Sequence, residues 1–223
     1  MDPIVVFDLD GTLADTADDI VGAVNHVFKV HDVPEFILGG RKWLISSGGR
    51  AIISAGLADV GMEVQRDQVE IFFRLFIDYY QEHVAVHSRL YPGAQTALEG
   101  LSRDGYKLAI CTNKSYGPTT QLLEKFSIQH YFAAVCGNDS LPWTKPDPRA
   151  LLSTIQLAKG DPKRCVMVGD TKPDVDAARS AGIPVIAVDF GYSDVPVEAL
   201  HPDLVMSDFA FLRDQVASIS RRR

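Results

Sequence analysis

From Leu90 onward the chain alternates between short apolar runs and helical patterns, and this alternation restricts the possible fold more than any other feature of the sequence. Together with a run near the N-terminus, the apolar runs predict six strands, at residues 4–8, 107–112, 133–136, 164–169, 184–189 and 204–206. Runs that are apolar throughout are typical of parallel strands that helices cover on both faces. The sequence therefore predicts an α/β fold with a Rossmann-like, doubly wound parallel sheet.

Residues 16–88 interrupt this pattern, because they contain no strong strand signal. Their apolar residues recur at helical spacing in two stripes, Ile20-Val21, Val24, Val27-Phe28, and later Val69, Phe72-Phe73, Phe76-Ile77, Tyr80. The Pro and Gly of Tyr91-Pro92-Gly93 mark the return to the sheet. We therefore predict a core formed by 1–15 and 89–223, with 16–88 inserted after the first strand as an all-helical cap.

Charge and cysteine content exclude several classes of protein. The chain of 223 residues has a formal net charge of -7, which argues against a nucleic-acid surface, and its one concentrated basic run, Arg221–Arg223, is interpreted as a solvated tail. Cys111, Cys136 and Cys165 lie in apolar runs and are expected to be buried, reduced thiols. No signal peptide or membrane-spanning segment is recognisable. We expect a cytoplasmic protein without a membrane partner. The oligomeric state is left open.

Two carboxylates follow the first apolar run directly. Asp8 and Asp10 are separated by one residue, and Gly11 permits a sharp turn that points both side chains into one cavity. Two such charges about 4 Å apart repel by roughly 4 kcal/mol at an effective dielectric constant of about 20. The pair therefore requires a cation, a shared proton or open solvent, and a hard divalent cation is the natural partner.

Other polar residues follow two further strands. Thr112 and Asn113 end one predicted strand, Asp170 ends another, and Asp174 lies one helical turn beyond it. In a doubly wound sheet, ligands bind outside the carboxyl ends of the strands. These side chains are therefore expected to meet at one site.

The ordered set of motifs resembles the haloacid dehalogenase superfamily, specifically its phosphatase branch with a helical cap. The matching motifs are Asp8-Leu9-Asp10-Gly11-Thr12, Thr112-Asn113, Lys145 within Lys145-Pro146-Asp147-Pro148, and Gly169-Asp170 with Asp174. The resemblance covers nearly the whole chain. Within the branch, Leu90-Tyr91-Pro92-Gly93 and the small cap resemble bacterial phosphoglycolate phosphatases, which is a less specific match.

The resemblance implies hydrolysis of a phosphate monoester through an aspartyl-phosphate. Asp8 would attack phosphorus, and Asp10 would protonate the leaving alkoxide and later deprotonate the attacking water. Thr112, Lys145 and the backbone amides after Asp8, those of Gly11 and Thr12 included, would bind the phosphoryl oxygens.

The implied cofactor is Mg²⁺. By resemblance its ligands are the side chains of Asp8 and Asp170 and the backbone carbonyl of Asp10, while Asp174 orients metal-bound water. Asn113 is assigned to orienting the substrate or the nucleophile.

Structural alternatives remain open for some of these residues. Asp174 follows Pro173 at a helix start, where a carboxylate also caps the helix. Lys145 could be an ordinary surface lysine. Asp15 is expected to be the N-cap of the helix that begins near Thr16.

The cap should choose the substrate. The segment 43–50 occupies the position of the family's specificity loop, and we hypothesise that Ser47, Gly48, Gly49 and Arg50 close over the site, with Arg50 pairing a substrate anion. The alternative is a simple helix-helix turn with a solvated arginine.

The predicted partner is a small phosphorylated metabolite, with phosphoglycolate as the first candidate. Dehalogenase and phosphonatase chemistry does not need the acid at Asp10, so both are disfavoured. A sugar phosphomutase shares the nucleophile and the acid and remains the enzymatic alternative. A catalytically silent binding module of the same fold is the third hypothesis.

Overall fold

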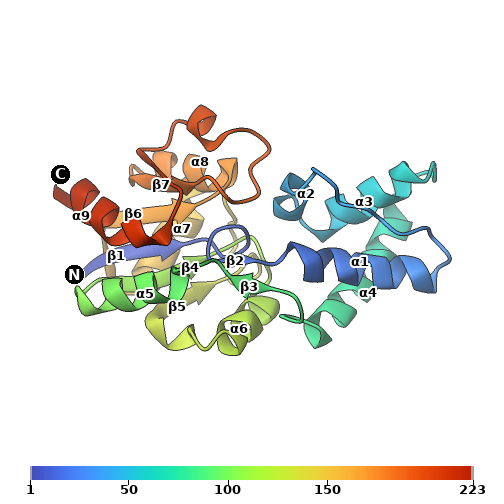
Figure 1. Ribbon diagram of the computed structural model, residues 1–223, viewed down its shortest axis with the longest axis horizontal. Coiled ribbons are helices and arrows are strands. Elements are labelled where there is room, and N and C mark those ends of the chain that lie inside the picture. The colour runs from blue at the N-terminus through green and yellow to red at the C-terminus, as the bar shows by residue number, and fades with distance from the viewer. Residues whose placement is uncertain (1, 222–223) are drawn as a thin grey trace.

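The computed structural model describes residues 2–221, and its centre is a six-stranded sheet in which every neighbouring pair is parallel (Figure 1). In spatial order the strands are β5 (Phe132–Cys136), β4 (Lys107–Cys111), β1 (Asp2–Phe7), β6 (Gly160–Gly169), β7 (Val185–Val188) and β8 (Leu204–Met206). The predicted α/β fold with a parallel sheet is confirmed. β6 begins earlier than predicted because Gly160 pairs with Asp2 across a register shift, outside the apolar run.

Helices cover both faces of this sheet. Alternate residues of β1 belong to two separate apolar clusters, with Val5 and Phe7 on one face and Ile4 and Val6 on the other. The first cluster includes side chains from α5 (Ala94–Arg103), α6 (Tyr116–Lys125) and α9 (Leu212–Arg221). The second includes side chains from α7 (Pro148–Leu157) and α8 (Lys172–Ser180). Three short 3-10 helices complete the core: η1 (Gln129–Tyr131), η2 (Val197–Leu200) and η3 (Phe209–Phe211).

A group of four helices lies to one side of the sheet (Figure 1). These are α1 (Ala17–Val30), α2 (Trp43–Ser46), α3 (Gly49–Asp59) and α4 (Arg66–Glu82), and they form the expected helical insertion. The chain enters and leaves the group through a two-stranded antiparallel sheet, β2 (Ala14–Asp15) and β3 (Arg89–Leu90). Strands of two residues give no periodic signal, so this small sheet was not predicted. The limits 1–15, 16–88 and 89–223 remain predictions.

The N-cap prediction for Asp15 is wrong by one position, although the Asp15 carboxylate accepts a 3.3 Å hydrogen bond from the amide of Ala17. Helix α1 begins at Ala17 with Thr16 as its N-cap, while Asp15 lies in β2 and accepts a 2.6 Å hydrogen bond from the Tyr192 hydroxyl. The same hydroxyl oxygen accepts the amide protons of Thr16 and Ala17, at 2.7 and 3.1 Å. Tyr192 is fully buried. Although it is distant in sequence, its hydroxyl provides a hydrogen-bond acceptor for backbone amides at the start of α1.

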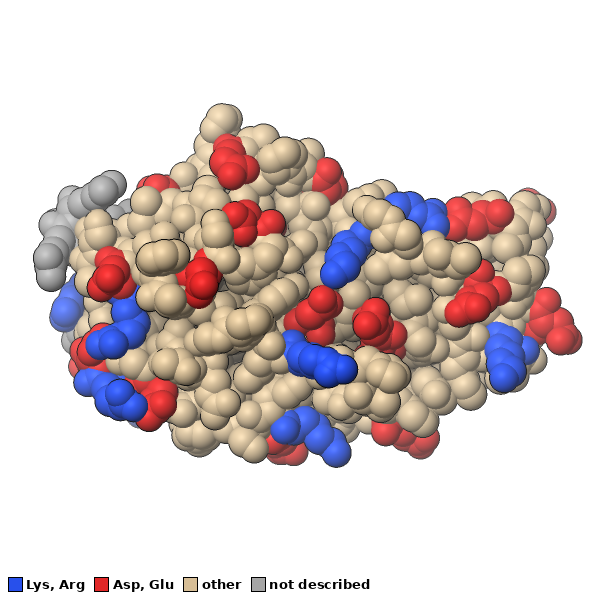
Figure 2. Space-filling view, viewed as in Figure 1, with Lys and Arg blue, Asp and Glu red and all other residues tan. Residues whose placement is uncertain are grey.

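The cysteines, the hydropathy of the helices and the C-terminal arginines are each the subject of a sequence-based expectation. Cys111, Cys136 and Cys165 are buried and form no disulfide, as predicted. In the described part of the chain, no helix has both the length and the hydropathy needed to cross a bilayer. Acidic and basic side chains are interspersed on the face shown in Figure 2. The predicted solvated arginine tail, Arg221–Arg223, lies outside the described residues, apart from the backbone of Arg221.

Candidate active site

The carboxyl ends of three neighbouring strands meet at one point. Asp8 follows β1, Thr112 follows β4 and Asp170 follows β6, while Asp174 projects from the first turn of α8. This is the edge at which parallel sheets bind ligands. A cavity of about 340 Å³ opens there, and residues of both the core and the helical insertion line it. The motif residues that are distant in sequence are therefore brought together as predicted.

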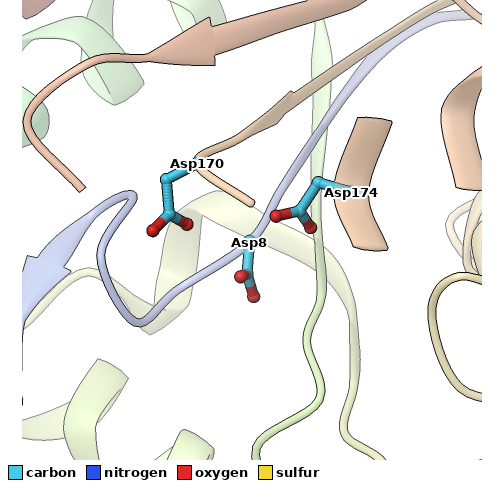
Figure 3. A group of neighbouring side chains, drawn as sticks. All are labelled: Asp8, Asp170 and Asp174. Carbon is cyan, nitrogen blue, oxygen red and sulfur yellow. The ribbon is translucent and has the colours of Figure 1, made fainter. Parts of the chain in front are cut away.

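Three carboxylates form a compact cluster in this region. One oxygen from each of Asp8, Asp170 and Asp174 lies within 4.8 Å of the other two, and all three residues are buried. In Figure 3, Asp170 and Asp174 lie on either side of Asp8. Hard oxygen donors in this arrangement can hold a metal ion.

Lys145 supplies a positive charge next to two of these carboxylates. Its ammonium group donates a 2.6 Å hydrogen bond to Asp174 Oδ1 and lies 3.0 Å from Asp8 Oδ1, with its side chain almost completely buried. Lys145 is therefore not an ordinary surface lysine. The other oxygen of Asp174 accepts from the Thr171 hydroxyl and amide, at 2.6 and 3.0 Å, so Asp174 both caps α8 and joins the cluster.

The Asp170 carboxylate is held in place by two hydrogen bonds and by close contact with a glycine. Its two oxygens accept hydrogen bonds from the Thr12 hydroxyl (2.8 Å) and the Tyr192 amide (2.7 Å). Gly11 lies against this carboxylate with φ +81°, and a Cβ atom there would come within 2.2 Å of Asp170 Oδ2. Only glycine leaves room for the carboxylate at this turn.

The cluster carries more negative charge than Lys145 balances. Burial raises the pKa of Asp8 to about 6, because desolvation and the Asp174 charge together outweigh the attraction of Lys145. Burial, followed by repulsion from Asp174 and Asp8, raises the pKa of Asp170 well above its ordinary value. Asp8 Oδ1 is buried, and the ammonium group of Lys145 lies 3.0 Å from it. Three buried carboxylates, two of them with raised pKa values, facing a single lysine fit a cation site.

The turn after Asp8 uses some of its amides internally. The amides of Gly11 and Thr12 donate to the carbonyl oxygens of Ala14 and Leu9, at 2.9 and 3.2 Å. Among the described residues, no hydrogen-bond acceptor faces the amides of Leu9 and Asp10. Of the amides after Asp8, those of Leu9 and Asp10 are therefore the free donors, while those of Gly11 and Thr12 are used within the turn.

Asp10 is surrounded by partners that sequence reasoning missed. Its Oδ1 accepts a 2.7 Å hydrogen bond from Thr16, and the ammonium group of Lys114 donates to both oxygens at 3.2 and 3.1 Å. Lys114 also donates to the hydroxyl of Tyr80 at 2.8 Å, which connects the core to α4. Lys114 directly follows the Thr112-Asn113 motif, and that position was the only sequence signal for it.

Asn113 contacts the lysine rather than a carboxylate. Its side-chain amide donates a 2.9 Å hydrogen bond to the carbonyl oxygen of Lys145, while its Oδ1 atom is buried without a partner among the described residues. Asn113 therefore holds the backbone from which the Lys145 side chain extends. Thr112 lines the cavity, and its hydroxyl oxygen accepts the Lys114 amide at 3.2 Å.

The segment 47–50 lines the same cavity as Asp8 and Asp10, as hypothesised for the specificity loop. Arg50, however, already has partners within the helical insertion. Its guanidinium group forms two hydrogen bonds with Glu70, at 2.7 and 2.9 Å, and lies 3.6 Å from the centroid of the Phe73 ring. The Arg50 side chain is nevertheless 54% exposed, so it is a partly solvated arginine paired with Glu70.

Comparison with known proteins agrees with this geometry. A family profile described as haloacid dehalogenase-like hydrolase matches residues 5–188. Phosphoglycolate phosphatases from Mesorhizobium japonicum and Agrobacterium fabrum are each 40% identical, over 96% and 95% of this chain and 95% and 91% of theirs. The crystal structure of a predicted phosphoglycolate phosphatase from Haemophilus somnus superposes with a TM-score of 0.88 at 31% identity, covering 95% of this chain and 96% of that one. The chain belongs to the haloacid dehalogenase-like hydrolases.

Proposed function

We propose that the protein is a Mg²⁺-dependent phosphatase that hydrolyses phosphoglycolate through an aspartyl-phosphate on Asp8. The observation that carries this proposal is the Asp8 carboxylate itself, which lines the cavity, lies 3.0 Å from the ammonium group of the buried Lys145 and forms a cluster with two further carboxylates. With a pKa of about 6 in the absence of metal, Asp8 is mostly ionised at neutral pH and can act as a nucleophile.

In the first step, an Asp8 oxygen forms a bond to phosphorus while the bond from phosphorus to the leaving alkoxide oxygen breaks. Asp10 gives its proton to that alkoxide, and the alcohol departs. In the second step, water attacks phosphorus, Asp10 takes the water proton, and the bond between phosphorus and Asp8 breaks. Lys145 and the amides of Leu9 and Asp10 bind the phosphoryl oxygens during both steps.

The side chains of Asp8 and Asp170 and the carbonyl oxygen of Asp10 would hold the magnesium ion, and Asp174 would orient its bound water. When bound, the ion reduces the repulsion between a carboxylate and a phosphate group. The residues present suit it, because Mg²⁺ prefers a few oxygen ligands and retains water.

Three observations support phosphoglycolate as the substrate. The relatives that match over nearly the full length are phosphoglycolate phosphatases. The cavity is small, which favours a small ester. The net charge of -7 means that an anionic substrate must be attracted by local cations, and the cavity provides Lys114 and Lys145. The three cysteines form no disulfide, which supports a reducing, cytoplasmic compartment.

The test is release of inorganic phosphate from phosphoglycolate, measured with and without Mg²⁺ for the wild type and for Asp8→Asn. The proposal predicts metal-dependent release by the wild type and loss of release in the variant. Transfer of phosphate between positions of a sugar phosphate with little net release would instead identify a phosphomutase. Binding without either reaction would identify a silent module.

A further inference from the structure

We propose that Lys114 and Tyr80 form the subsite that binds the carboxylate group of the substrate. This inference rests on the proposed function and names the part of the site that selects an acidic phosphate ester. Lys114 follows β4 in the core and Tyr80 lies on α4, so the subsite is assembled across the two parts of the molecule.

The two side chains present a positive charge and one free hydrogen-bond donor to the cavity. Both line it, and Lys114 Nζ lies 2.8 Å from the Tyr80 hydroxyl oxygen. That oxygen accepts a hydrogen bond from the ammonium group, so the hydroxyl proton of Tyr80 is available for donation. Among the described residues, nothing accepts the Tyr80 hydroxyl proton. A carboxylate suits this pair, because it can accept from the Tyr80 hydroxyl while its charge faces the ammonium group.

The position of the pair relative to Asp10 fixes which substrate group it meets. Lys114 Nζ lies 3.1 Å from Asp10 Oδ2, and Asp10 is the proposed proton donor to the leaving oxygen. In phosphoglycolate, the carboxylate carbon is two bonds from that oxygen. A cation that touches Asp10 therefore lies within reach of the substrate carboxylate when the leaving oxygen contacts Asp10.

The other two cations of the cavity have different partners. Lys145 is paired with Asp8 and Asp174 beneath the phosphoryl site. Arg50, which the sequence suggested for this role, is held in two hydrogen bonds by Glu70. Lys114 is thus the cation on the leaving-group side of the site, and packing restricts it, because its side chain is only 7% exposed.

The experiment compares phosphoglycolate with 2-hydroxyethyl phosphate, a neutral-tailed ester of similar size. The measured quantity is the ratio of the two kcat/KM values, because loss of the Lys114 charge also affects Asp10 with either substrate. We expect Lys114→Met to lower this ratio about 100-fold and Tyr80→Phe to lower it about 10-fold, as for a charged and a neutral hydrogen bond. Arg50→Gln is the matched control and should leave the ratio unchanged.

Equal losses for both esters in Lys114→Met and Tyr80→Phe would overturn the inference and assign the pair to holding Asp10. A selective loss in Arg50→Gln alone would overturn it in favour of the arginine. Tyr80→Phe retains the ring that packs on Phe76, so the test survives if Lys114→Met does not fold.

A calorimetric arm separates this inference from the proposed function. Binding of both esters is measured in Mg²⁺ buffer on Asp8→Asn, with and without Tyr80→Phe and Lys114→Met. Tighter binding of phosphoglycolate that either second substitution removes supports the subsite, even if the wild type releases no phosphate. Equal affinity for the two esters in Asp8→Asn contradicts it.

Discussion

The ammonium group of Lys145 donates a 2.6 Å hydrogen bond to the Asp174 carboxylate, and both side chains are almost completely buried. Burial opposes the charge of the lysine, but Asp174 and Asp8 raise its pKa above the ordinary value. Removal of the lysine would leave buried carboxylates facing one another without a counter-charge. The stability of the metal-free protein should therefore depend on this residue.

Lys145→Met is expected to lower the free energy of unfolding by about 3 kcal/mol in EDTA, since removing one member of a buried ion pair leaves the other charge without compensation. Chemical denaturation of the variant and the wild type measures this difference. Lys172→Met provides a control, because Lys172 pairs with Asp176 at the exposed surface and should change stability by less than about 1 kcal/mol. Equal stabilities of Lys145→Met and the wild type would contradict the role of the buried pair.

The stability of the metal-free protein should also depend on pH. Because the pKa of Asp8 rises from 3.8 to about 6 on folding, the folded state binds more protons than the unfolded state between these values. Stability in EDTA should consequently fall as the pH rises from about 4 to about 6. Asp170, whose pKa is also raised, contributes in the same direction. Thermal unfolding across this pH range measures the effect.

Added Mg²⁺ should raise Tm more at pH 7 than at pH 5, since the ion binds the charged carboxylates. Asp8→Asn should flatten the pH dependence in EDTA. A stability that rises with pH over this interval in EDTA would contradict the raised pKa values.

Gly11→Ala tests the close contact behind Asp170. The added Cβ would meet Asp170 Oδ2 at 2.2 Å in a backbone conformation of φ +81°. We expect a loss of several kcal/mol of stability, together with loss of activity, from strain and displacement of the carboxylate. Gly105→Ala is a matched control, because Gly105 has φ +84° and nothing lies within 4 Å of the added atom. It should cost only about 1–2 kcal/mol, and equal costs for the two substitutions would refute the contact.

Asp10→Asn tests the proton transfer. The variant should hydrolyse alkyl esters such as phosphoglycolate about 10²–10⁴-fold more slowly. With p-nitrophenyl phosphate, the rate of the first step should fall much less, because nitrophenolate departs without a proton. Burst kinetics with this substrate separate the two steps. An equal slowing of the first step for both substrates would argue against Asp10 as the acid.

The sequence was most informative where the chemistry is local. Asp8, Asp10 and Asp170 immediately follow or end apolar runs, so strand ends alone placed them at one edge of the sheet. Tyr192 could not be found this way, since it contacts Asp15 from 177 positions away. Lys114 and Tyr80 were missed because they belong to the core and the helical insertion, and only the packed structure brings them together.

The Arg50 prediction shows a similar limit. Its place in the cavity followed from the motif, but its pairing with Glu70 depends on how α3 packs against α4. Likewise, the amides of Gly11 and Thr12 are consumed by a tight turn whose hydrogen bonds sequence patterns do not specify. Backbone geometry, rather than residue type, decides which amides remain available.

The most direct test of hydrolysis through an aspartyl-phosphate is a search for the covalent intermediate on Asp8. Wild-type protein is mixed with phosphoglycolate and Mg²⁺, quenched in acid within the first turnover, digested and analysed by mass spectrometry. If Asp8 is the nucleophile, the peptide that contains Asp8 should carry a phosphoryl group. That group should be absent from Asp8→Asn and from samples in EDTA. Phosphate release with no phosphoryl group on that peptide, or a phosphoryl group on another residue, would contradict Asp8 as the nucleophile.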